Sequence, residues 1–489
     1  MTSHNGHKPS AKGTRDSDES SPSLATLSSL SQLPVPTDPN YVYPLSSFPP
    51  TEAFEVSLKY PSLIIPVRQT ASLRKQLKHI LLHRPKLKNV YDVLDTDEIP
   101  TTSGSDDSSQ ARSSYRKLVL VDRPDVYKDP EIKSLIESGE CCKGSHTIKF
   151  GYSDWSVDEL LRKLVPLDDK ELPSSFETIG TLAHVNLRAD QLPFKFIIGK
   201  VLLDKNSPRI KTVVNKVGAI ETEYRTFGME IIAGYSDEGW SRVTAKEEGC
   251  TFELDFREVY WNSRLCGEHR RLVRLIQDDA KKKYPETTPT VIADLMAGIG
   301  PFAVPLTCKR VVSGDKQDVV IKVYANDLNP SSFKYLERNA QKNKCTYLEC
   351  YNMDARAFCH QLQDQGIEFH HVLMNLPGTA PEFLDCFRGF IGSFLPRIHV
   401  HCFGPKSESD DTKESLILRC SNALGCTINV KDHQVSVHMV RDVSPKKNMY
   451  CISFTLPKEA RDIPRISTSK SPLTATDEDP EPKRAKLSN

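Results

Sequence analysis

The chain has 489 residues, with 65 lysines and arginines against 64 aspartates and glutamates, so its net charge is +1. This length corresponds to about three domains of ordinary size, and a hydrophobic content of 38% is enough to build their cores. The balanced charge excludes a uniformly basic nucleic-acid coat and a highly acidic protein, although local basic surfaces remain compatible with it. No apolar run approaches the roughly 18 residues of a membrane-spanning helix. We therefore expect a soluble protein that does not contact membranes.

The 13 cysteines are spread from Cys141 to Cys451 without any CxxC spacing. A disulfide framework or a structural zinc site would need paired, regular spacings, so we expect reduced thiols and no metal centre. Residues 1–31 lack the apolar core of a secretory signal. They are rich in serine, but Asp16, Asp18 and Glu19 are atypical of a mitochondrial presequence.

Composition places the folded part of the chain between two polar termini. Residues 1–40 and 461–489 are predicted to be disordered, because they are rich in polar residues and proline and poor in large apolar side chains. A first α+β domain is predicted at 41–140, with a disordered insert near 97–113. A second α+β domain is predicted at 146–285. Their expected elements are helices at 72–82 and 156–164 and strands at 117–121, 196–202 and 251–256.

The third folded block, residues 286–460, alternates short apolar runs with helical patterns. Buried strands are predicted at 291–296, 319–325, 346–351, 370–374 and 397–403, and a helix is predicted at 331–343. This alternation is typical of βαβ units, which build a parallel sheet through right-handed crossovers. The block is therefore expected to be a Rossmann-like α/β domain.

Polar side chains follow four successive strands of this block, at the edge where such sheets bind ligands. Asp294 precedes a turn with two glycines, Asp327 follows the second strand, Asp354 the third and Asn375 the fourth. Acids cap helices and glycines make turns, so any one of them has an ordinary structural explanation. All four in order favour a nucleoside site.

The ligand that this pattern favours is S-adenosylmethionine rather than a nicotinamide dinucleotide. The full GxGxxG fingerprint of a pyrophosphate site is absent, and Pro301 follows the second glycine of the turn. An acid after the second strand is placed to accept hydrogen bonds from a ribose diol. The segment Asn375–Gly378 is similar to the loop with which methyltransferases acting on planar nitrogens hold a base edge.

A segment rich in aromatic residues and arginine, Phe256–Arg271, leads into this domain. The helical part of it carries Glu268 among several arginines. A solvated linker helix would explain the later lysine run, Lys281–Lys283, but not an acid placed directly before the cofactor site. We therefore treat Glu268 as a candidate functional residue.

Four longer motifs complete the pattern: HVNLRADQLPFKFIIGKVLLDKN at His184–Asn206, VNKVGAIETEYRTFGMEIIAG at Val214–Gly234, VYWNSRLCGEH at Val259–His269 and DLMAGIGPFAVPL at Asp294–Leu306. With YANDLNP and MNLPG, they make the chain similar to the eukaryotic and archaeal tRNA (guanine-37 N1)-methyltransferases over most of residues 150–456, and more weakly back to about residue 41. The resemblance implies a class I methyltransferase domain preceded by two smaller α+β RNA-binding domains. It also implies methyl transfer from S-adenosylmethionine to N1 of guanosine 37, which gives m1G37 and S-adenosylhomocysteine. That product maintains the reading frame and is the first step toward wybutosine in phenylalanine tRNA.

The resemblance also assigns roles to individual residues. It implies that Glu268 is the general base, that Arg225 acts on the target guanine and that Tyr260 supports Arg225. The target-base loop falls on Asn375 and Pro377. The implied cofactor contacts are His269, Asp327, Leu328, Asp354, Ala355 and Asn375. One departure is Ser263, which stands where family members usually have proline and could loosen the turn before Glu268.

The chemistry of guanine agrees with these assignments. N1 of neutral guanine carries a proton that a base must remove, and a carboxylate suits this role if partial burial raises its pKa. A guanidinium such as that of Arg225 would stabilise the charge that develops on O6. Reaching this base requires unstacking it from the anticodon loop. Basic stretches at 67–88 and 195–216 could follow tRNA phosphates, so the expected partner is tRNA, both anticodon stem-loop and body, bound by a monomer.

Two other functions remain open at this level. Related wybutosine-pathway enzymes use the same cofactor but transfer its aminocarboxypropyl group, and product mass would separate them from a methyltransferase. A non-enzymatic RNA-binding protein could keep the fold, although intact Glu268 and Asp327 argue against it. Absence of cofactor binding would favour that reading.

The C-terminal tail suggests a test of where the protein is located in the cell. Residues 480–487 read PEPKRAKL, a short basic cluster of the form that nuclear import receptors bind, while the family is found in nucleus, cytoplasm and mitochondrial matrix. We predict that deleting residues 483–486 shifts a fluorescent fusion out of the nucleus and leaves methylation in vitro unchanged. An unaltered distribution would show that the tail is not the signal.

Overall fold

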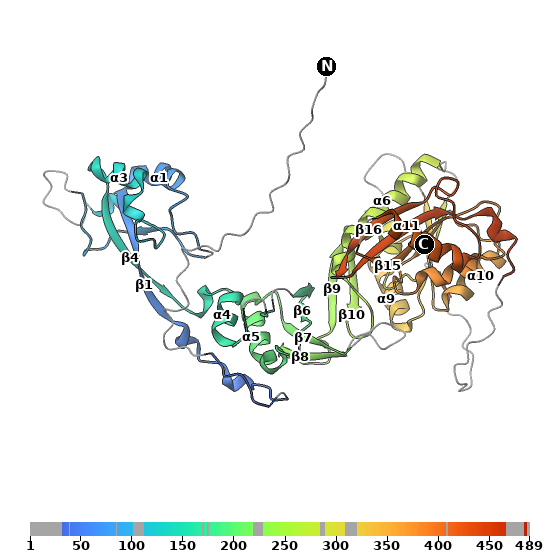
Figure 1. Ribbon diagram of the computed structural model, residues 1–489, viewed down its shortest axis with the longest axis horizontal. Helices are drawn as coiled ribbons and strands as arrows, with labels where there is room; N and C mark the ends of the chain where they lie inside the picture. Colours follow the sequence, from blue (N-terminus) through green and yellow to red (C-terminus); the bar gives the residue numbers. More distant parts are fainter. Residues whose placement is uncertain are drawn as a thin grey trace, which may run out of the picture. The chain divides into compact units, whose positions relative to one another are not determined.

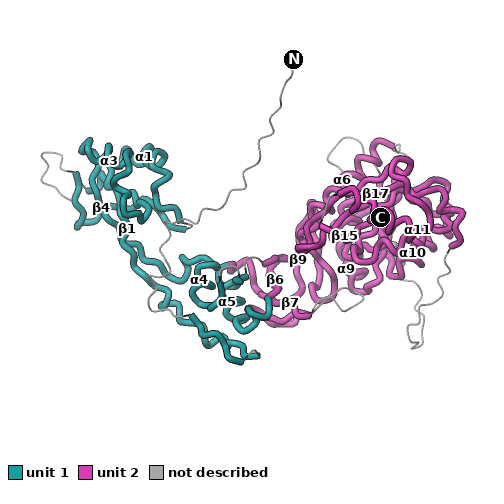
Figure 2. The backbone as a smooth tube through the Cα atoms, viewed as in Figure 1, with its two compact units in different colours: residues 1–174, 188–205 teal, residues 175–187, 206–489 magenta. Residues whose placement is uncertain are grey.

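The structure, a computed structural model, describes residues 32–38, 40–84, 86–100, 112–168, 171–173, 176–218, 228–283, 289–308, 320–406 and 409–465, together with the backbone of 484–486. The chain forms two compact units (Figure 2). Unit 1 comprises residues 1–174 and 188–205, and unit 2 comprises residues 175–187 and 206–489. The segment expected to form the second domain thus contributes to both units. Among the described residues, no helix is both long and apolar enough to cross a membrane.

Unit 1 is built on an antiparallel sheet with the strand order β2-β3-β1-β4 (Figure 1). Its strands are β1 (Val56–Pro66), β2 (Val90–Asp92), β3 (Tyr115–Val119) and β4 (Cys142–Phe150), and the helices α1 (Thr70–Gln76) and α3 (Pro130–Glu137) belong to the same part of the chain. Leu63, Leu77, Leu118 and Ile132 pack in its core. Strand β3 confirms the strand expected at 117–121, and α1 is shorter than the helix expected at 72–82.

Two further helices of unit 1 show where apolar patterns are informative and where they are not. Helix α4 (Val157–Leu164) confirms the helix expected at 156–164, and Ser156 caps it by accepting a hydrogen bond from the Glu159 amide at 3.3 Å. The strand expected at 196–202 is wrong, because this run lies in helix α5 (Lys195–Asn206). This helix is buried on several sides, so its apolar residues follow one another in the sequence. The periodicity of such a run does not distinguish a strand from a helix.

Unit 2 begins with a small mixed sheet, in which β5 (Glu177–Ile179), β6 (Leu182–Val185), β7 (Thr212–Val217) and β8 (Gly228–Gly234) lie in sequence order. A hairpin follows, formed by β9 (Arg242–Glu247) and β10 (Cys250–Asp255), and β10 confirms the strand expected at 251–256.

The hairpin is attached to the larger domain through asparagine side chains of helix α9 (Pro330–Lys342) and its C-cap. The Asn339 carboxamide accepts from the Glu253 amide at 2.8 Å and donates to the Ile299 carbonyl at 3.1 Å. Asn343 accepts from the Thr251 amide and donates to the Thr251 carbonyl, both at 2.8 Å. These side chains therefore satisfy backbone groups of β10 that would otherwise need a neighbouring strand.

The large sheet of unit 2 has the strand order β16-β17-β15-β14-β11-β12-β13-β18. Its parallel strands are β11 (Thr290–Asp294), β12 (Ile321–Asn326), β13 (Leu348–Tyr351), β14 (His371–Met374) and β15 (Arg397–Pro405), which confirm the five strands expected in this block. Antiparallel partners are β16 (Ser436–Ser444), β17 (Lys447–Thr455) and the short β18 (Arg484–Lys486). The chain runs outward from β11 to β13 and then returns to β14 on the other side of β11. The resulting switch point lies between β11 and β14.

Helices cover both faces of this sheet. Alternate strand residues such as Ile292 and Ala293 belong to different apolar clusters, as expected when successive side chains point to opposite faces. One cluster includes α6 (Cys266–Lys283), α7 (Ala303–Thr307) and α9, and the other includes α10 (Ala355–Asp364) and α11 (Asp410–Leu424). The α/β class, with an α+β region before it, is thereby confirmed.

The turn after β11 yields a prediction about stability. Gly300 has φ +96°, and a Cβ added there would lie 2.7 Å from Cγ2 of Val304 and 2.8 Å from Cδ1 of Leu336. We predict that Gly300→Ala lowers the free energy of unfolding by roughly 1–3 kcal/mol through overpacking and left-handed strain, measured by urea denaturation. Gly298→Ala is the matched control, since φ there is +56° but no atom lies within 4 Å of the added Cβ. Equal losses in both variants would contradict the packing argument.

Candidate active site

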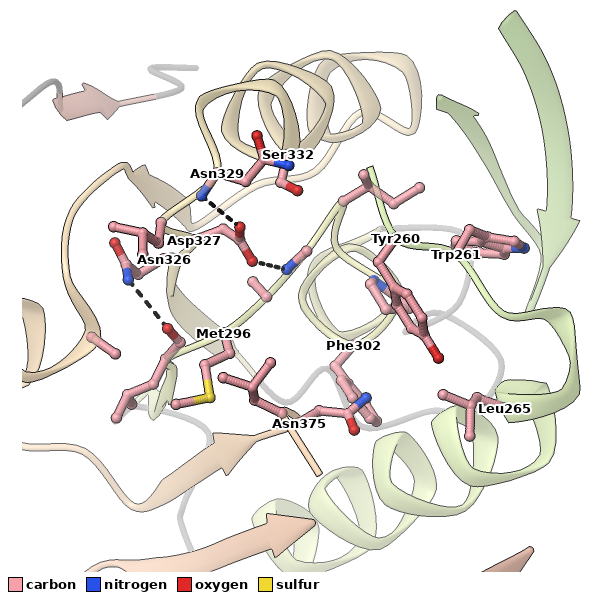
Figure 3. A pocket seen from close by; sticks show the side chains of 18 of the residues that line it. Tyr260, Trp261, Leu265, Met296, Phe302, Asn326, Asp327, Asn329, Ser332 and Asn375 are labelled. Carbon is pink, nitrogen blue, oxygen red and sulfur yellow. Dashed lines mark hydrogen bonds between the residues drawn. The ribbon is translucent and has the colours of Figure 1, made fainter. Parts of the chain in front are cut away.

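A cleft opens at the carboxyl ends of β11, β12, β13 and β14 (Figure 3). This is the edge at which doubly wound sheets bind ligands, next to the switch point. The expected cofactor contacts all line the cleft: His269, Asp327, Leu328, Asp354, Ala355 and Asn375. Three of the four polar strand ends expected from the sequence, Asp327, Asp354 and Asn375, thus line one concave surface, whereas Asp294 is fully buried and does not line it.

The turn after β11 forms one wall of this cleft. Gly298 adopts a left-handed conformation and faces open space, because a Cβ there would meet no atom within 4 Å. Gly300 instead lies against the side chains of Val304 and Leu336, so it allows close packing of the turn. The two glycines therefore serve different purposes: Gly298 leaves room beside the cleft, and Gly300 fixes the turn to the core.

Asp327 joins the ends of the first two strands. Its carboxylate accepts hydrogen bonds from the Gly298 amide at 2.8 Å and from the Asn329 amide at 3.0 Å (Figure 3). Burial raises the pKa of Asp327 from its ordinary value, and these amides oppose the rise. A carboxylate that accepts from two amides is well oriented, and its position after β12 suits a ribose diol.

The remaining walls combine helix caps with apolar side chains. Asp354 caps α10 by accepting from the amides of Arg356 at 2.9 Å and Ala357 at 3.1 Å, so it has a structural role besides lining the cleft. Leu328 is 41% exposed beside the opening. The side-chain oxygen of Asn375 is buried and has no hydrogen-bond partner among the described residues. Such a group is costly unless a ligand supplies a donor.

A second cavity adjoins the cleft and is called the smaller cavity here because fewer residues line it. The two share Tyr260, Asn262, Leu265 and Asn375, and the smaller one adds Pro377 and Phe403. Tyr260, from the segment after β10, and Asn375, from the end of β14, thus border both spaces (Figure 3). The expected target-base loop and the expected cofactor contacts are therefore neighbours.

Two charged residues of this smaller cavity were not foreseen from the sequence, namely Glu177 and Arg441. Glu177 lies in β5, and one oxygen of its carboxylate is 3.0 Å from the Arg264 guanidinium. No motif singles out either residue, and only the folding of β5 and β16 toward this space reveals them.

His269 is held by an acid of the hairpin. Its Nδ1 lies 2.5 Å from Oε1 of Glu247 in β9, and its ring meets the Phe302 ring edge-on at 4.9 Å between centroids. Both side chains of the His269–Glu247 pair are buried. This pair fixes the imidazole at the rim of the cleft.

Glu268 lies on the first turn of α6, but its carboxylate lines neither cavity. The Arg271 guanidinium donates to both oxygens, at 2.6 and 2.7 Å, and Nε2 of His401 lies 2.8 Å from Oε1. Burial alone would raise the pKa of Glu268, but the hydrogen bonds and charges of Arg271 and His401 lower it to about 2. The raised pKa expected for a partly buried catalytic carboxylate is therefore wrong, because the contacts with Arg271 and His401 outweigh burial, and Glu268 is ionised throughout the neutral range.

The other expected site residues are placed as follows. Arg225 lies outside the described residues. Ser263 starts the 3-10 turn Ser263–Leu265, where the Asn262 side chain accepts from the Arg264 amide at 3.1 Å. The cap made by Asn262 maintains the turn before Glu268 despite the loss of the proline typical of the family.

A mostly parallel sheet with helices on both faces, a cleft at its switch point and an acid placed to suit a ribose diol, without a pyrophosphate fingerprint, are typical of a class I methyltransferase domain. Comparisons with known proteins narrow this class. Residues 157–238 match the family described as TYW2 N-terminal domain, and residues 243–416 match the TRM5/TYW2 methyltransferase domain.

Curated relatives cover nearly the whole chain. The tRNA (guanine(37)-N(1))-methyltransferase 1 of Phaeodactylum tricornutum is 52% identical over 457 residues, which is 93% of this chain and 98% of the relative. The tRNA (guanine(37)-N(1))-methyltransferase of Phytophthora infestans is 37% identical, covering 89% and 97%. The chain therefore belongs to the tRNA (guanine(37)-N(1))-methyltransferase family, as the resemblance indicated.

Solved structures agree with the fold. Trm5b from Pyrococcus abyssi is 22% identical with a TM-score of 0.51, covering 81% of this chain and 99% of that protein. A complex of aTrm5 with tRNALeu has the same TM-score and coverage at 19% identity.

The cleft generates a prediction about Asp327. We predict that Asp327→Ala weakens S-adenosylmethionine binding by roughly 1.5–3 kcal/mol, the worth of a hydrogen bond to a charged group, in isothermal titration calorimetry, with tRNA affinity little altered. Asp411→Ala removes an exposed acid that does not line the cleft, so it should bind the cofactor normally. Unchanged cofactor affinity in Asp327→Ala would contradict the assignment.

Proposed function

We propose that this protein transfers the methyl group of S-adenosylmethionine to N1 of guanosine 37 in tRNA. The observation that carries the proposal is the pair of adjoining cavities that share Tyr260 and Asn375, one suited to a nucleoside and the other to a flipped base. Methyl transfer requires donor and acceptor to meet within near-attack distance. Membership in a family named for this reaction supports the same conclusion.

The residues of the larger cleft fit the cofactor. Asp327 is placed for the ribose hydroxyls, the open space beside Gly298 leaves room for the amino-acid portion, and Ala355 and Leu328 offer apolar contact to the adenine. His269 and Asp354 complete the rim. When bound, S-adenosylmethionine supplies an electrophilic methyl group on a sulfonium sulfur.

The smaller cavity receives the target base. Asn375 brings a buried side-chain oxygen without a partner among the described residues, which suits a donor on the edge of guanine. Tyr260 and Pro377 bound the space in which the ring lies. A base enters such a space only after unstacking from the anticodon loop.

Glu268 removes the proton from N1, and Arg225 stabilises the charge that develops on O6. Glu268 is ionised at neutral pH, which is the form that accepts a proton. Its position on α6, three residues after Leu265, puts it next to a residue that lines both cavities. Its carboxylate lines neither cavity in the free protein, so binding of the tRNA base has to bring N1 and the carboxylate together while Arg271 and His401 remain its partners, in keeping with catalytic hydrogen bonds that tighten only in the substrate complex.

A second candidate reaction is transfer of the aminocarboxypropyl group of the same cofactor. The observation in its favour is that both matched family descriptions also name TYW2. The mass added to the tRNA distinguishes the two reactions.

The cellular setting is part of the same proposal. The enzyme acts as a monomer in the nucleus and cytoplasm, with a mitochondrial matrix pool. The basic cluster near the C-terminus and the family resemblance support this distribution. Light scattering of the purified protein tests the monomer.

The test of the proposed function is methylation of tRNA transcripts with G or A at position 37, followed by mass analysis of the modified nucleoside. We predict one added methyl on the G37 transcript only, and a single-turnover rate about 10²–10⁴-fold lower for Glu268→Gln, the usual contribution of a general base.

Glu253→Gln serves as a control, because Glu253 is a surface acid that pairs with Lys342. Its rate should stay normal. Modification of A37, or an added aminocarboxypropyl mass, would refute the proposed reaction, whereas a normal rate for Glu268→Gln would refute only the assignment of the base.

A further inference from the structure

The surroundings of Glu268 raise a physical problem for any catalytic carboxylate at this place. Its side chain is only 2% exposed, and burial disfavours the charged form. A carboxyl group that stayed protonated could not take a proton from N1. The ionised form therefore depends on what the rest of the domain supplies to Glu268.

His401 is one of the two groups that lower the pKa of Glu268 through hydrogen bonds. It lies in β15, directly opposite Cys451 of β17, and has no solvent exposure. Its Nε2 is 2.8 Å from Oε1 of Glu268, and its ring lies beside that of Phe302, with 6.2 Å between centroids. His401 lines neither cavity, so its contact with Glu268 does not involve a ligand.

Charged and titratable groups face His401 from several elements. Glu268 and Arg271 belong to α6, Cys451 to β17 and His438 to β16, while Asp294 at the end of β11 and His399 in β15 act from a greater distance. Burial lowers the pKa of His401, but Cys451 and Glu268 raise it to about 10. Because the Glu268 carboxylate is ionised and can only accept, the His401 ring donates a hydrogen bond to its Oε1 through Nε2–H.

A bound metal cation is a weaker explanation of why Glu268, His401 and Cys451 lie together. The donor atoms of Glu268, His401 and Cys451 lie within 4.8 Å of one another. The Arg271 guanidinium, however, already contacts both carboxylate oxygens and also interacts with Cys451. A guanidinium in that place supplies the positive charge and repels a metal ion.

We propose that His401 is a positioning residue for the catalytic base: through its Nε2–H it fixes one oxygen of Glu268 and, together with Arg271, keeps the carboxylate ionised inside the domain. This inference rests on the proposed role of Glu268 and adds a residue that no sequence motif points to. His401 touches neither substrate nor cofactor and acts only through Glu268.

The proposal makes a specific statement about pH. In the wild type the pKa of Glu268 is about 2, so no loss of activity from its protonation is expected above pH 4. Without the hydrogen bond and charge of His401, only Arg271 counteracts the effect of burial, which raises the pKa of Glu268. The pKa of Glu268 is therefore expected to rise. Activity should then fall as the pH drops toward the new, higher pKa, which creates an acidic limb in the pH–rate profile.

A neighbouring histidine provides a matched control. His399 lies two residues earlier in the same strand and is equally buried. Its Nδ1 is 2.8 Å from the Ser453 hydroxyl and its Nε2 is 3.1 Å from Nδ1 of His371. A variant of His399 disturbs the same part of the sheet without removing a hydrogen bond from Glu268.

The experiment measures single-turnover methylation of a G37 tRNA transcript between pH 5 and 9 for His401→Phe, His401→Gln and His399→Phe. We expect the rate of His401→Phe to fall about 2-fold between pH 7 and pH 5, beyond any change seen in the wild type, because losing an opposite charge raises the pKa of a carboxyl group by about 1–3 units. His401→Gln retains an N–H donor, so its acidic limb should be smaller. His399→Phe should keep the shape of the wild-type profile, and cofactor affinity should be normal in all three.

Several results would overturn the proposal. One is a His401→Phe profile that superimposes on that of the wild type, and another is an equal shift in His399→Phe. Loss of cofactor binding would show that His401→Phe does not fold. In that case His401→Gln is compared with the shorter His401→Asn. Equal pH–rate profiles for these two variants would refute positioning by the hydrogen bond. A normal rate for Glu268→Gln would instead show that Glu268 is not the base, which is a separate failure.

Discussion

A buried carboxylate is stable only where several donors converge on it, and this constraint organises the catalytic domain. Asp327 meets it with the backbone amides of Gly298 and Asn329, and these contacts tie the turn after β11 to the start of α9. Glu268 meets it with the side chains of Arg271 and His401. The first carboxylate lines the cleft, while the second is a buried charge that lines neither cavity.

The surroundings of Asp327 and of Glu268 differ in how they respond to a substrate. Amides of a tight turn are fixed by the backbone, so Asp327 is preorganised before any ligand arrives. Arg271 and His401 are side chains, so they can shift together with the Glu268 carboxylate when the target base arrives, without leaving buried charges unpaired. Cofactor binding is therefore expected to need little rearrangement, and recognition of the tRNA base to need more.

Much of this site was predictable because it depends on local spacing. The four polar strand ends follow from the βαβ pattern, and the parallel sheet brings them to one edge whatever the details of the loops. The resemblance to a known family, rather than spacing, singled out Tyr260 and Pro377, which border the smaller cavity. Spacing could not reveal Glu177, Arg441 or His401, because their partners are distant in the sequence and meet only after the sheet has formed.

The prediction of a strand at residues 196–202 is wrong for a related reason. An uninterrupted apolar run reports that a segment is buried but not which backbone conformation buries it, and α5 is buried widely enough to lose the alternation of polar and apolar faces. Glu268 shows the complementary limit, since the sequence indicated its importance but not that Arg271, one helical turn later, would hold its charge.

The asparagine contacts between α9 and β10 have a consequence for solubility. An exposed edge strand offers a row of unpaired backbone groups to other chains, and proteins commonly block such edges. Here the carboxamides of Asn339 and Asn343 occupy the amides of Glu253 and Thr251, so a foreign strand could not pair with β10 without displacing them. The same asparagines that anchor the hairpin therefore also protect the enzyme against edge-to-edge aggregation while it folds.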